Sequence, residues 1–217
     1  MKQNYQLMLD KVIDGIKSEG TRPRLLLHAC CAPCSSYVLE YLSDYFEITL
    51  FYYNPNITPE SEYDFRVEEL IRLTREMPMV REPEVVVAPY APEEFFLATR
   101  GLEDMSEGKG RCALCYRLRL EKTAQTALEG DYDYFCTTLT VGRLKRADWL
   151  NDIGVSLEKK YGVKYLESDF KKNDGNKRSC ELSAEYGLYR QEYCGCEFSK
   201  REAEEKQNKK KEQEKEI

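Results

Sequence analysis

Long apolar runs are missing from this sequence of 217 residues. No stretch approaches the ~18 consecutive apolar residues of a membrane-spanning helix, so no membrane partner is expected. The N-terminal segment 1–20 has the pattern of an amphipathic helix with interspersed charges, which is not the pattern of a secretory signal peptide. We therefore expect a cytoplasmic protein, in a compartment where structural disulfides are rare.

Histidine is almost absent, because His28 is the only one in the chain. A Ser-His-Asp hydrolase and a histidine-rich metal centre are therefore nearly excluded. A lone histidine is usually a packing residue, but His28 lies beside a cysteine cluster and is also a candidate proton donor. The net charge of −6 gives no general preference for nucleic acid, although it leaves room for a local basic patch.

Cysteine, by contrast, is plentiful, because the chain has nine of them. Seven fall in three short clusters, Cys30-Cys31-Ala-Pro-Cys34, Cys112-Ala-Leu-Cys115 and Cys194-Gly-Cys196. Thiolates are soft ligands that suit zinc and iron–sulfur clusters, and closely spaced pairs also carry out redox chemistry. An odd number of cysteines argues against a framework of paired disulfides. The clusters therefore predict a shared metal or redox site that assembles when the chain folds.

Two of the clusters leave several chemistries open. Cys112 and Cys115 lie at a predicted helix start, where the helix dipole lowers a thiol pKa and favours thiolate. Their C-x-x-C spacing fits a zinc pair, a thioredoxin-like dithiol or two ligands of a cluster. The glycine between Cys194 and Cys196 permits a tight turn, so that pair could chelate a metal or form a strained, easily reduced disulfide.

The two isolated cysteines have simpler interpretations. Cys136 lies within or at the end of a predicted strand, where a small buried side chain is expected. Cys180 is placed at a predicted helix start and is treated as incidental.

Apolar runs that alternate with helical patterns predict an α/β fold. The predicted strands cover residues 24–29, 47–53, 84–88, 132–139 and 163–166. The predicted helices cover residues 1–20, 35–42, 58–77, 110–128, 145–161 and 179–191. Continuous apolar strands separated by helices imply a parallel sheet with helices on both faces. Ligand sites of such sheets lie beyond the carboxyl ends of the strands, so the cysteine-rich metal site is expected there.

We expect one α/β metalloenzyme domain over residues 1–198. Residues 199–217 have almost no apolar side chains and carry mixed charge, which predicts a charged helix extension or tail. The glutamates interspersed among its lysines argue against an RNA-binding arm.

The loop at residues 30–36 contains no glycine and matches neither G-x-x-x-x-G-K-[ST] nor G-x-G-x-x-G. In the PP-loop ATP pyrophosphatases this place carries a Ser-Gly-Gly-x-Asp-Ser motif. The chain resembles a PP-loop/HUP-like scaffold in which thiols replace the ATP site.

Basic residues near the same edge are candidate RNA contacts. They are Arg143, Lys145, Arg146, Lys171, Lys172, Lys177 and Arg178. The last four lie in the segment KKNDGNKR, which is predicted to be a loop because of its central turn residues. An ordinary solvated surface is an equally good interpretation of these charges.

Four motifs in this order resemble the QueH type of epoxyqueuosine reductase. They are LHACCAPC at residues 27–34, GRCALCYRLRL at 110–120, FCTTL at 135–139 and YRQEYCGC at 189–196. The resemblance implies an oxidoreductase that removes the epoxide oxygen of epoxyqueuosine at the wobble position of a tRNA anticodon, giving queuosine. It also implies a [4Fe-4S] cluster with a nearby iron ion or dithiol, tRNA as the partner, and an electron donor that the sequence does not identify.

Seven clustered thiols exceed the four ligands of one cluster, so three remain for a second redox element. We assign the cluster to Cys30, Cys31, Cys112 and Cys115, because both pairs should lie at the ends of elements that face the same edge.

The second redox element is then assigned to the third cysteine cluster. Cys194 and Cys196 are predicted to be catalytic, either as ligands of a second metal ion or as a redox dithiol. Cys34 is a further candidate metal ligand.

Two other functions remain open from the sequence. One is an RNA-binding module without redox activity, in which Cys112, Cys115, Cys194 and Cys196 hold a structural zinc ion. The other is a PP-loop-like tRNA thiolase, which also uses three cysteines and an iron–sulfur cluster. A thiolase of that kind needs ATP, and the missing glycine-rich loop argues against it.

Overall fold

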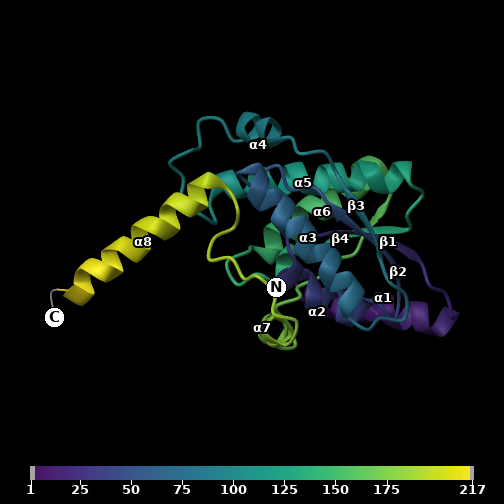
Figure 1. The fold of residues 1–217 in the computed structure, drawn as a ribbon. Helices are drawn as coiled ribbons and strands as arrows, with labels where there is room; N and C mark the ends of the chain where they lie inside the picture. The colour runs from purple at the N-terminus through teal and green to yellow at the C-terminus, as the bar shows by residue number, and fades with distance from the viewer. Residues whose placement is uncertain (1–2, 216–217) are drawn as a thin grey trace.

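The computed structural model describes residues 3–215, and five strands form one parallel sheet in the order β3-β2-β1-β4-β5 (Figure 1). The strands are β1 (Arg24–His28), β2 (Glu47–Tyr52), β3 (Glu84–Val87), β4 (Tyr134–Thr137) and β5 (Lys164–Tyr165). The helices are α1 (Tyr5–Glu19), α2 (Ala32–Leu42), α3 (Glu60–Glu76), α4 (Pro92–Ala98), α5 (Gly110–Glu129), the 3₁₀ helix η1 (Thr138–Val141), α6 (Ala147–Tyr161), α7 (Gly175–Glu185) and α8 (Glu197–Lys215). The predicted fold class is confirmed.

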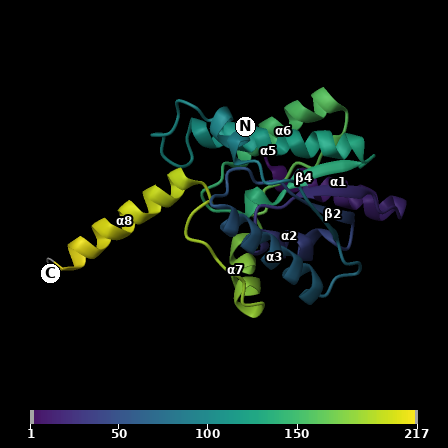
Figure 2. The same ribbon diagram turned by 45° about the horizontal axis from the view of Figure 1, so that its top comes forward.

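Helices cover both faces of the sheet, as alternate residues of β1 show. Leu25 and Leu27 pack in the core that includes Leu39 of α2, whereas Leu26 packs in a second core with Leu120 of α5. Figure 2 shows α5 and α6 on one side of the sheet and α2 and α3 on the other. Successive side chains of a strand point to opposite faces, so a strand buried on both faces has an unbroken apolar sequence.

The direction of the chain across the sheet reverses beside β1. From β1 the chain moves outward through β2 and β3, and it then returns to place β4 and β5 on the other side. The residues that follow β1 and β4 are consequently neighbours: Thr138 Oγ1 accepts a hydrogen bond from the Cys30 N–H at 3.3 Å. Open parallel sheets bind ligands at such a reversal, beyond the carboxyl ends of the strands.

One predicted helix is misplaced. Helix α7 begins at Gly175 and ends at Glu185, so the prediction of a helix over 179–191 is wrong at both ends, and Cys180 lies inside the helix. The turn before it covers residues 170–174 and ends with Asn173 and Asp174, which have φ of 51° and 58°. Gly175 then packs against the backbone of residue 170, where an added Cβ would lie 2.1 Å from the carbonyl oxygen. Close packing therefore places the helix start earlier than the sequence pattern does.

Smaller differences concern helix starts. Helix α2 begins at Ala32 rather than at residue 35, and α3 has Pro59 rather than Thr58 at its N-cap. Helix α4 was not predicted, because its seven residues give too short a periodic pattern.

Helix α8 extends away from the rest of the molecule (Figures 1 and 2). Its first turn follows Cys194 and Cys196 directly, so the charged C-terminal segment begins at the cysteine-rich edge. The division into a domain over 1–198 and an extension from residue 199 stays a prediction. Within residues 3–215, no helix is both long enough and apolar enough to span a bilayer.

A substitution at the contact between α6 and β5 tests how closely the core is packed there. Gly154 faces the Tyr165 ring, and an added Cβ would lie 2.3 Å from Cε1. We predict that Gly154→Ala lowers the free energy of unfolding by about 1–3 kcal/mol, because a methyl group in a filled core forces its neighbours apart. Gly15→Ala in α1 is the matched control, because its Cβ would meet nothing within 4 Å. The control should raise stability by about 0.5–1 kcal/mol in urea unfolding, and an equal gain for Gly154→Ala would contradict this packing.

Candidate metal centre

All three cysteine clusters meet beyond the carboxyl ends of the strands, where they line two adjoining cavities. The first thiol set lines an open cavity of about 570 Å³ and consists of Cys30, Cys31 and Cys34. The second thiol set lines a narrower cavity and consists of Cys112, Cys115, Cys194 and Cys196. Cys194 lines both cavities. The predicted cysteine-rich site at this edge is therefore confirmed, whereas the predicted division of ligands between cluster and second element stays a prediction.

The first thiol set has the spacing of ligands to a single metal ion. Its three sulfurs lie within 4.8 Å of one another, and the Sγ atoms of Cys30 and Cys31 are 3.8 Å apart. A tetrahedral ion with metal–sulfur bonds of about 2.3 Å separates its sulfur ligands by about 3.8 Å. The donor set therefore fits one ion held by three thiolates, with a fourth position left for another ligand.

Local structure favours negative charge at the first thiol set. Cys31 is the N-cap of α2 and Cys34 lies in its first turn, where the helix dipole stabilises an anion. Hydrogen bonds from the thiols of Cys30 and Cys34 hold the pKa of Cys31 well below its ordinary value. Hydrogen bonds with the thiols of Cys30 and Cys31 raise the pKa of Cys34 well above its ordinary value. The three residues therefore share one thiolate, and binding of a metal ion would release the remaining protons.

The second thiol set is spaced more widely. Within residues 3–215, no three of its four sulfurs lie within 4.8 Å of one another. This spacing is too wide for a single tetrahedral ion, whereas an iron–sulfur cluster is a larger body with one sulfur ligand on each iron. Burial raises the pKa of Cys115 to about 12, and burial also raises the pKa of Cys112 and of Cys196. Without a bound cation these thiols would therefore stay protonated at neutral pH.

Hydrogen bonds to sulfur are already in place in the second thiol set. The backbone N–H of Gly108 donates to Cys112 Sγ at 3.2 Å, and that of Ser199 donates to Cys196 Sγ at 3.4 Å. Hydrogen bonds to the sulfurs are among the features that set the reduction potential of an iron–sulfur cluster.

Arg119 of α5 provides a test of whether an anionic group fits here. The side chain is 1 % exposed and lines both cavities. Its hydrogen bonds go to neutral oxygens, Asn54 Oδ1 at 3.1 Å and the Cys115 carbonyl at 3.4 Å, while Nη2 has no partner. Buried oxygens of Asn56 and Tyr116 beside it are also unpartnered. A buried cation is costly without nearby negative charge, and a metal–thiolate group in the second thiol set would supply that charge.

Lys145 is largely enclosed rather than exposed on the outer surface, and its predicted contact with an RNA phosphate stays a prediction. The side chain is 12 % exposed, and its Nζ lies 3.0 Å from Cys194 Sγ and 2.7 Å from Glu107 Oε1. Burial by itself lowers the pKa of Lys145, but electrostatic interactions with Cys194, Tyr116 and Glu107 outweigh burial and raise that pKa well above its ordinary value. Lys145 is therefore a largely enclosed cation that faces Cys194.

Other basic residues predicted to contact RNA form ion pairs within the chain. Arg146 pairs with Asp148, and Arg178 pairs with Glu40 at 2.6 Å. Arg143 is exposed and lines the open cavity beside the first thiol set. Of these three side chains, Arg143 is the best placed to meet a ligand at the thiols.

His28 supports the end of β1. Its ring is fully buried, with Nδ1 2.9 Å from Thr137 Oγ1 and Nε2 3.2 Å from the Tyr53 carbonyl. Burial, together with the positive charge of Arg119, lowers the pKa of His28 to about 3. A neutral ring protonated on Nε2 satisfies both contacts, so His28 is a packing residue and does not donate a proton at neutral pH.

Sequence reasoning did not identify Arg119, Asn56 or Glu107 as part of the site. Glu107 and Asn56 lie in irregular segments and belong to none of the motifs. For Arg119 two signals were available: it lies in the motif at residues 110–120, and it follows Cys115 by one helical turn, which places both on one face of α5.

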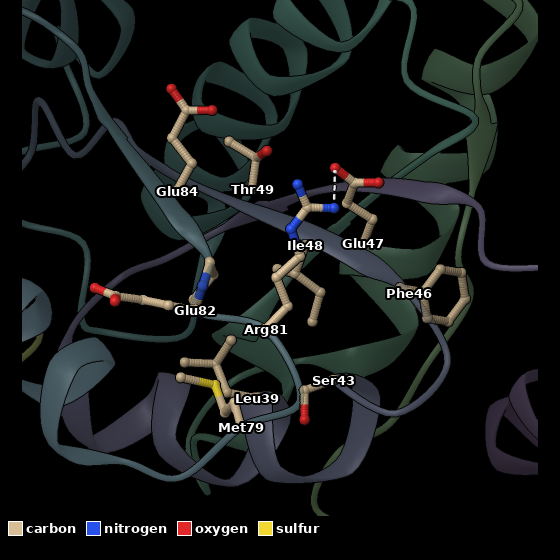
Figure 3. Close-up of a pocket in the computed structure, with 11 residues that line it drawn as sticks. Leu39, Ser43, Phe46, Glu47, Ile48, Thr49, Met79, Arg81, Glu82 and Glu84 are labelled. Carbon is tan, nitrogen blue, oxygen red and sulfur yellow. Dashed lines mark ion pairs between the residues drawn. The ribbon is translucent and has the colours of Figure 1, made fainter.

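A third cavity, of about 130 Å³, lies at the opposite end of the sheet, where β2 and β3 begin (Figure 3). Its lining includes Phe46, Met79 and an ion pair between Arg81 and Glu47 at 2.9 Å, but no cysteine. The thiol chemistry therefore belongs to the carboxyl end of the sheet alone.

Comparison with known proteins agrees with the motifs at the thiols. A family profile described as epoxyqueuosine reductase QueH matches residues 25–202. This chain belongs to the QueH family. The QueH protein of Streptococcus pyogenes serotype M1 is 42 % identical over 200 residues, which cover 91 % of this chain and 78 % of the relative. The QueH protein of Thermotoga maritima is 36 % identical over 185 residues, which cover 84 % of this chain and 93 % of the relative.

The fold is shared with a solved protein outside the QueH family. The U34-tRNA thiolase NcsA from Methanococcus maripaludis, solved with its [4Fe-4S] cluster, superimposes with a TM-score of 0.52 at 13 % identity. The similarity covers 95 % of this chain and 74 % of the thiolase. It supports the predicted PP-loop-like architecture and says nothing about catalysis at this level of identity.

Gly195 allows a test of how the second thiol set is positioned. Its φ is 115°, and an added Cβ would lie 2.8 Å from Ile57 Cγ1 and 3.0 Å from Arg66 Nη1. We predict that Gly195→Ala loses most of its bound iron, because the loop that carries Cys194 and Cys196 must shift.

Gly187→Ala is the matched control, because it has φ of 57° but no neighbour within 4 Å of the added Cβ. The control should lose about 1–2 kcal/mol of stability and keep its iron. Iron would be measured by a colorimetric assay on anaerobically reconstituted protein. A full iron content in Gly195→Ala would contradict the predicted role of this turn.

Proposed function

We propose that this epoxyqueuosine reductase holds two separate redox elements in its two thiol sets. A single iron ion would be bound by Cys30, Cys31 and Cys34. A [4Fe-4S] cluster would be bound by Cys112, Cys115, Cys194 and Cys196. The contrast in spacing carries this proposal, since three sulfurs lie within 4.8 Å of one another in the first set and no three do so in the second set within residues 3–215.

The reaction requires two electrons. Removing an epoxide oxygen as water consumes two electrons and two protons and leaves an alkene. An iron–sulfur cluster supplies electrons one at a time, and an adjacent metal ion can act as a Lewis acid toward oxygen. The electrons come from an external donor, which the chemistry of the site does not identify.

The open cavity is the proposed substrate site. Its volume of about 570 Å³ lies within the usual range of about 300–1,000 Å³ for small-molecule sites. Apolar side chains of Leu139, Val141 and Leu144 face the same space as the first thiol set. A base in a tRNA anticodon loop is already single-stranded, so it can enter a cavity with little cost of unpairing.

Charged and aromatic groups around the open cavity would hold the rest of the nucleotide. Arg143 and Arg190 line it and could contact phosphates, and Tyr193 could stack on a base. Because contacts to phosphate weaken as salt rises, we expect tRNA binding to depend on ionic strength.

The first turn of α2 is poorly suited to binding the phosphates of ATP. Helix α2 begins with Ala32 and Pro33, and a proline has no backbone N–H to offer a phosphate. Thiols stand at the N-cap, Cys31, and in the first turn, Cys34, which supports the reductase over the thiolase alternative. Calorimetry should detect no ATP binding, and a thiolase would bind it.

Metal analysis of cysteine variants tests the proposed division directly. Wild-type protein reconstituted without oxygen should hold about five irons and four sulfides, the content of one cluster plus one ion. Cys34→Ser should lose about one iron and keep its sulfide and brown colour, because it removes a ligand of the single ion alone. Cys112→Ser should lose the sulfide and the colour, because it removes a cluster ligand.

The control for these variants is Cys180→Ser, which changes an exposed thiol. It should leave the iron and sulfide contents unchanged, because Cys180 belongs to neither thiol set, although it lines the open cavity. Loss of sulfide in Cys34→Ser would contradict the proposed division. A colourless wild-type protein that binds zinc instead would favour the structural-zinc alternative.

A further inference from the structure

Lys145 is a cation that contacts a sulfur of the second thiol set and also lines the proposed substrate cavity. Its Nζ contacts Cys194 Sγ at 3.0 Å, and Cys194 is the one thiol that lines both cavities. Lys145 itself lines the open cavity. The contact therefore lies at the boundary between the proposed cluster and the proposed substrate site.

The backbone and the neighbours of Lys145 hold the ammonium group in place. Gly142 leaves room for the lysine stem, because an added Cβ at Gly142 would lie 2.9 Å from Lys145 Cγ. Glu107 Oε1 accepts a hydrogen bond from Lys145 Nζ at 2.7 Å, and the backbone N–H of Glu107 donates a hydrogen bond to Glu202 Oε1 at 2.9 Å. The ammonium group is therefore pre-organised beside Cys194, rather than free to move in solvent.

A fixed cation beside a cluster ligand changes the energy of adding an electron. One-electron reduction makes the cluster and its thiolates more negative by one charge. A nearby positive charge stabilises the reduced form, and the effect is strong in a buried site where water screens poorly. Glu107 has the opposite effect, because its carboxylate offsets part of the lysine charge.

We propose that Lys145 is a positioning residue that raises the reduction potential of the cluster through its hydrogen bond to Cys194. Glu107 has the opposite effect and lowers that potential. This inference rests on the proposed placement of the cluster in the second thiol set. It assigns a role to two residues that belong to neither thiol set.

A potentiometric titration with dithionite and redox mediators would measure the role of Lys145, with reduction followed by loss of visible absorbance. At the potential where half of the wild-type cluster is reduced, the ratio of reduced to oxidised cluster in Lys145→Met should fall about tenfold, a shift of about 59 mV for a one-electron couple. Lys145→Arg keeps the charge and should restore most of the ratio.

Glu107→Gln provides the opposite test, because it removes the negative charge and keeps Lys145. Its reduced fraction at the same potential should rise. Lys160→Met is the matched control, because it removes a lysine that pairs with Glu121 at 2.5 Å and contacts no thiol. Its potential should equal that of the wild type.

The outcomes separate this inference from the proposed function. An iron-replete Lys145→Met protein with the wild-type potential would overturn the inference while leaving the two redox elements intact. If Lys145→Met does not hold its cluster, Glu107→Gln decides, and an unchanged potential there also overturns the inference. A wild-type protein without a reducible iron–sulfur chromophore would contradict the proposed function itself, and this inference with it.

Discussion

The central place of β1 in an all-parallel sheet is the constraint on which the site depends. Because β1 pairs with β2 on one side and β4 on the other, the chain changes direction beside it. The segments after β1 and β4 are thereby forced together, as the contact between Cys30 and Thr138 shows. The thiol clusters of α5 and of the segment before α8 are added to that edge by packing of the helices around it.

Because the thiols are concentrated at one edge of the sheet, other residues of the site must supply the positive charge that balances them. The seven clustered cysteines and Cys180 line the two cavities there, and no titrating histidine is available, since the pKa of His28 is lowered to about 3 by burial and by Arg119. Positive charge comes instead from Arg119 and Lys145, which are buried beside Cys115 and Cys194. Buried cations and buried anions are each costly alone, so the two groups stabilise each other.

Much of the scaffold could be predicted from the sequence. The apolar run at residues 24–29 predicted a strand buried on both faces, and β1 is such a strand. The cysteine-rich edge followed from the rule that ligands bind beyond the carboxyl ends of parallel strands. The start of α7 did not follow, because it depends on the contact of Gly175 with the backbone of residue 170 and with the Tyr37 ring.

The grouping of the thiols could not be predicted from spacing along the chain. Cys30 and Cys31 were predicted to bind the cluster with Cys112 and Cys115, which stays a prediction, and the structure shows in addition that their sulfurs lie within 4.8 Å of Cys34. Three-dimensional proximity among separate clusters depends on how α5 and the segment before α8 pack, which no local pattern encodes. The same limit applies to Lys145, which was predicted as a basic residue near the edge, while its contacts with Cys194 and Glu107 were not.

The most direct test of the two-element site is an anomalous-scattering map at the iron edge, measured on crystals of the iron-loaded protein. We predict a single-atom peak about 2.3 Å from the sulfurs of Cys30, Cys31 and Cys34, as metal–thiolate bonds require. A separate four-iron peak should be enclosed by Cys112, Cys115, Cys194 and Cys196. One cluster with ligands from both thiol sets, such as Cys30 together with Cys112, would contradict this account.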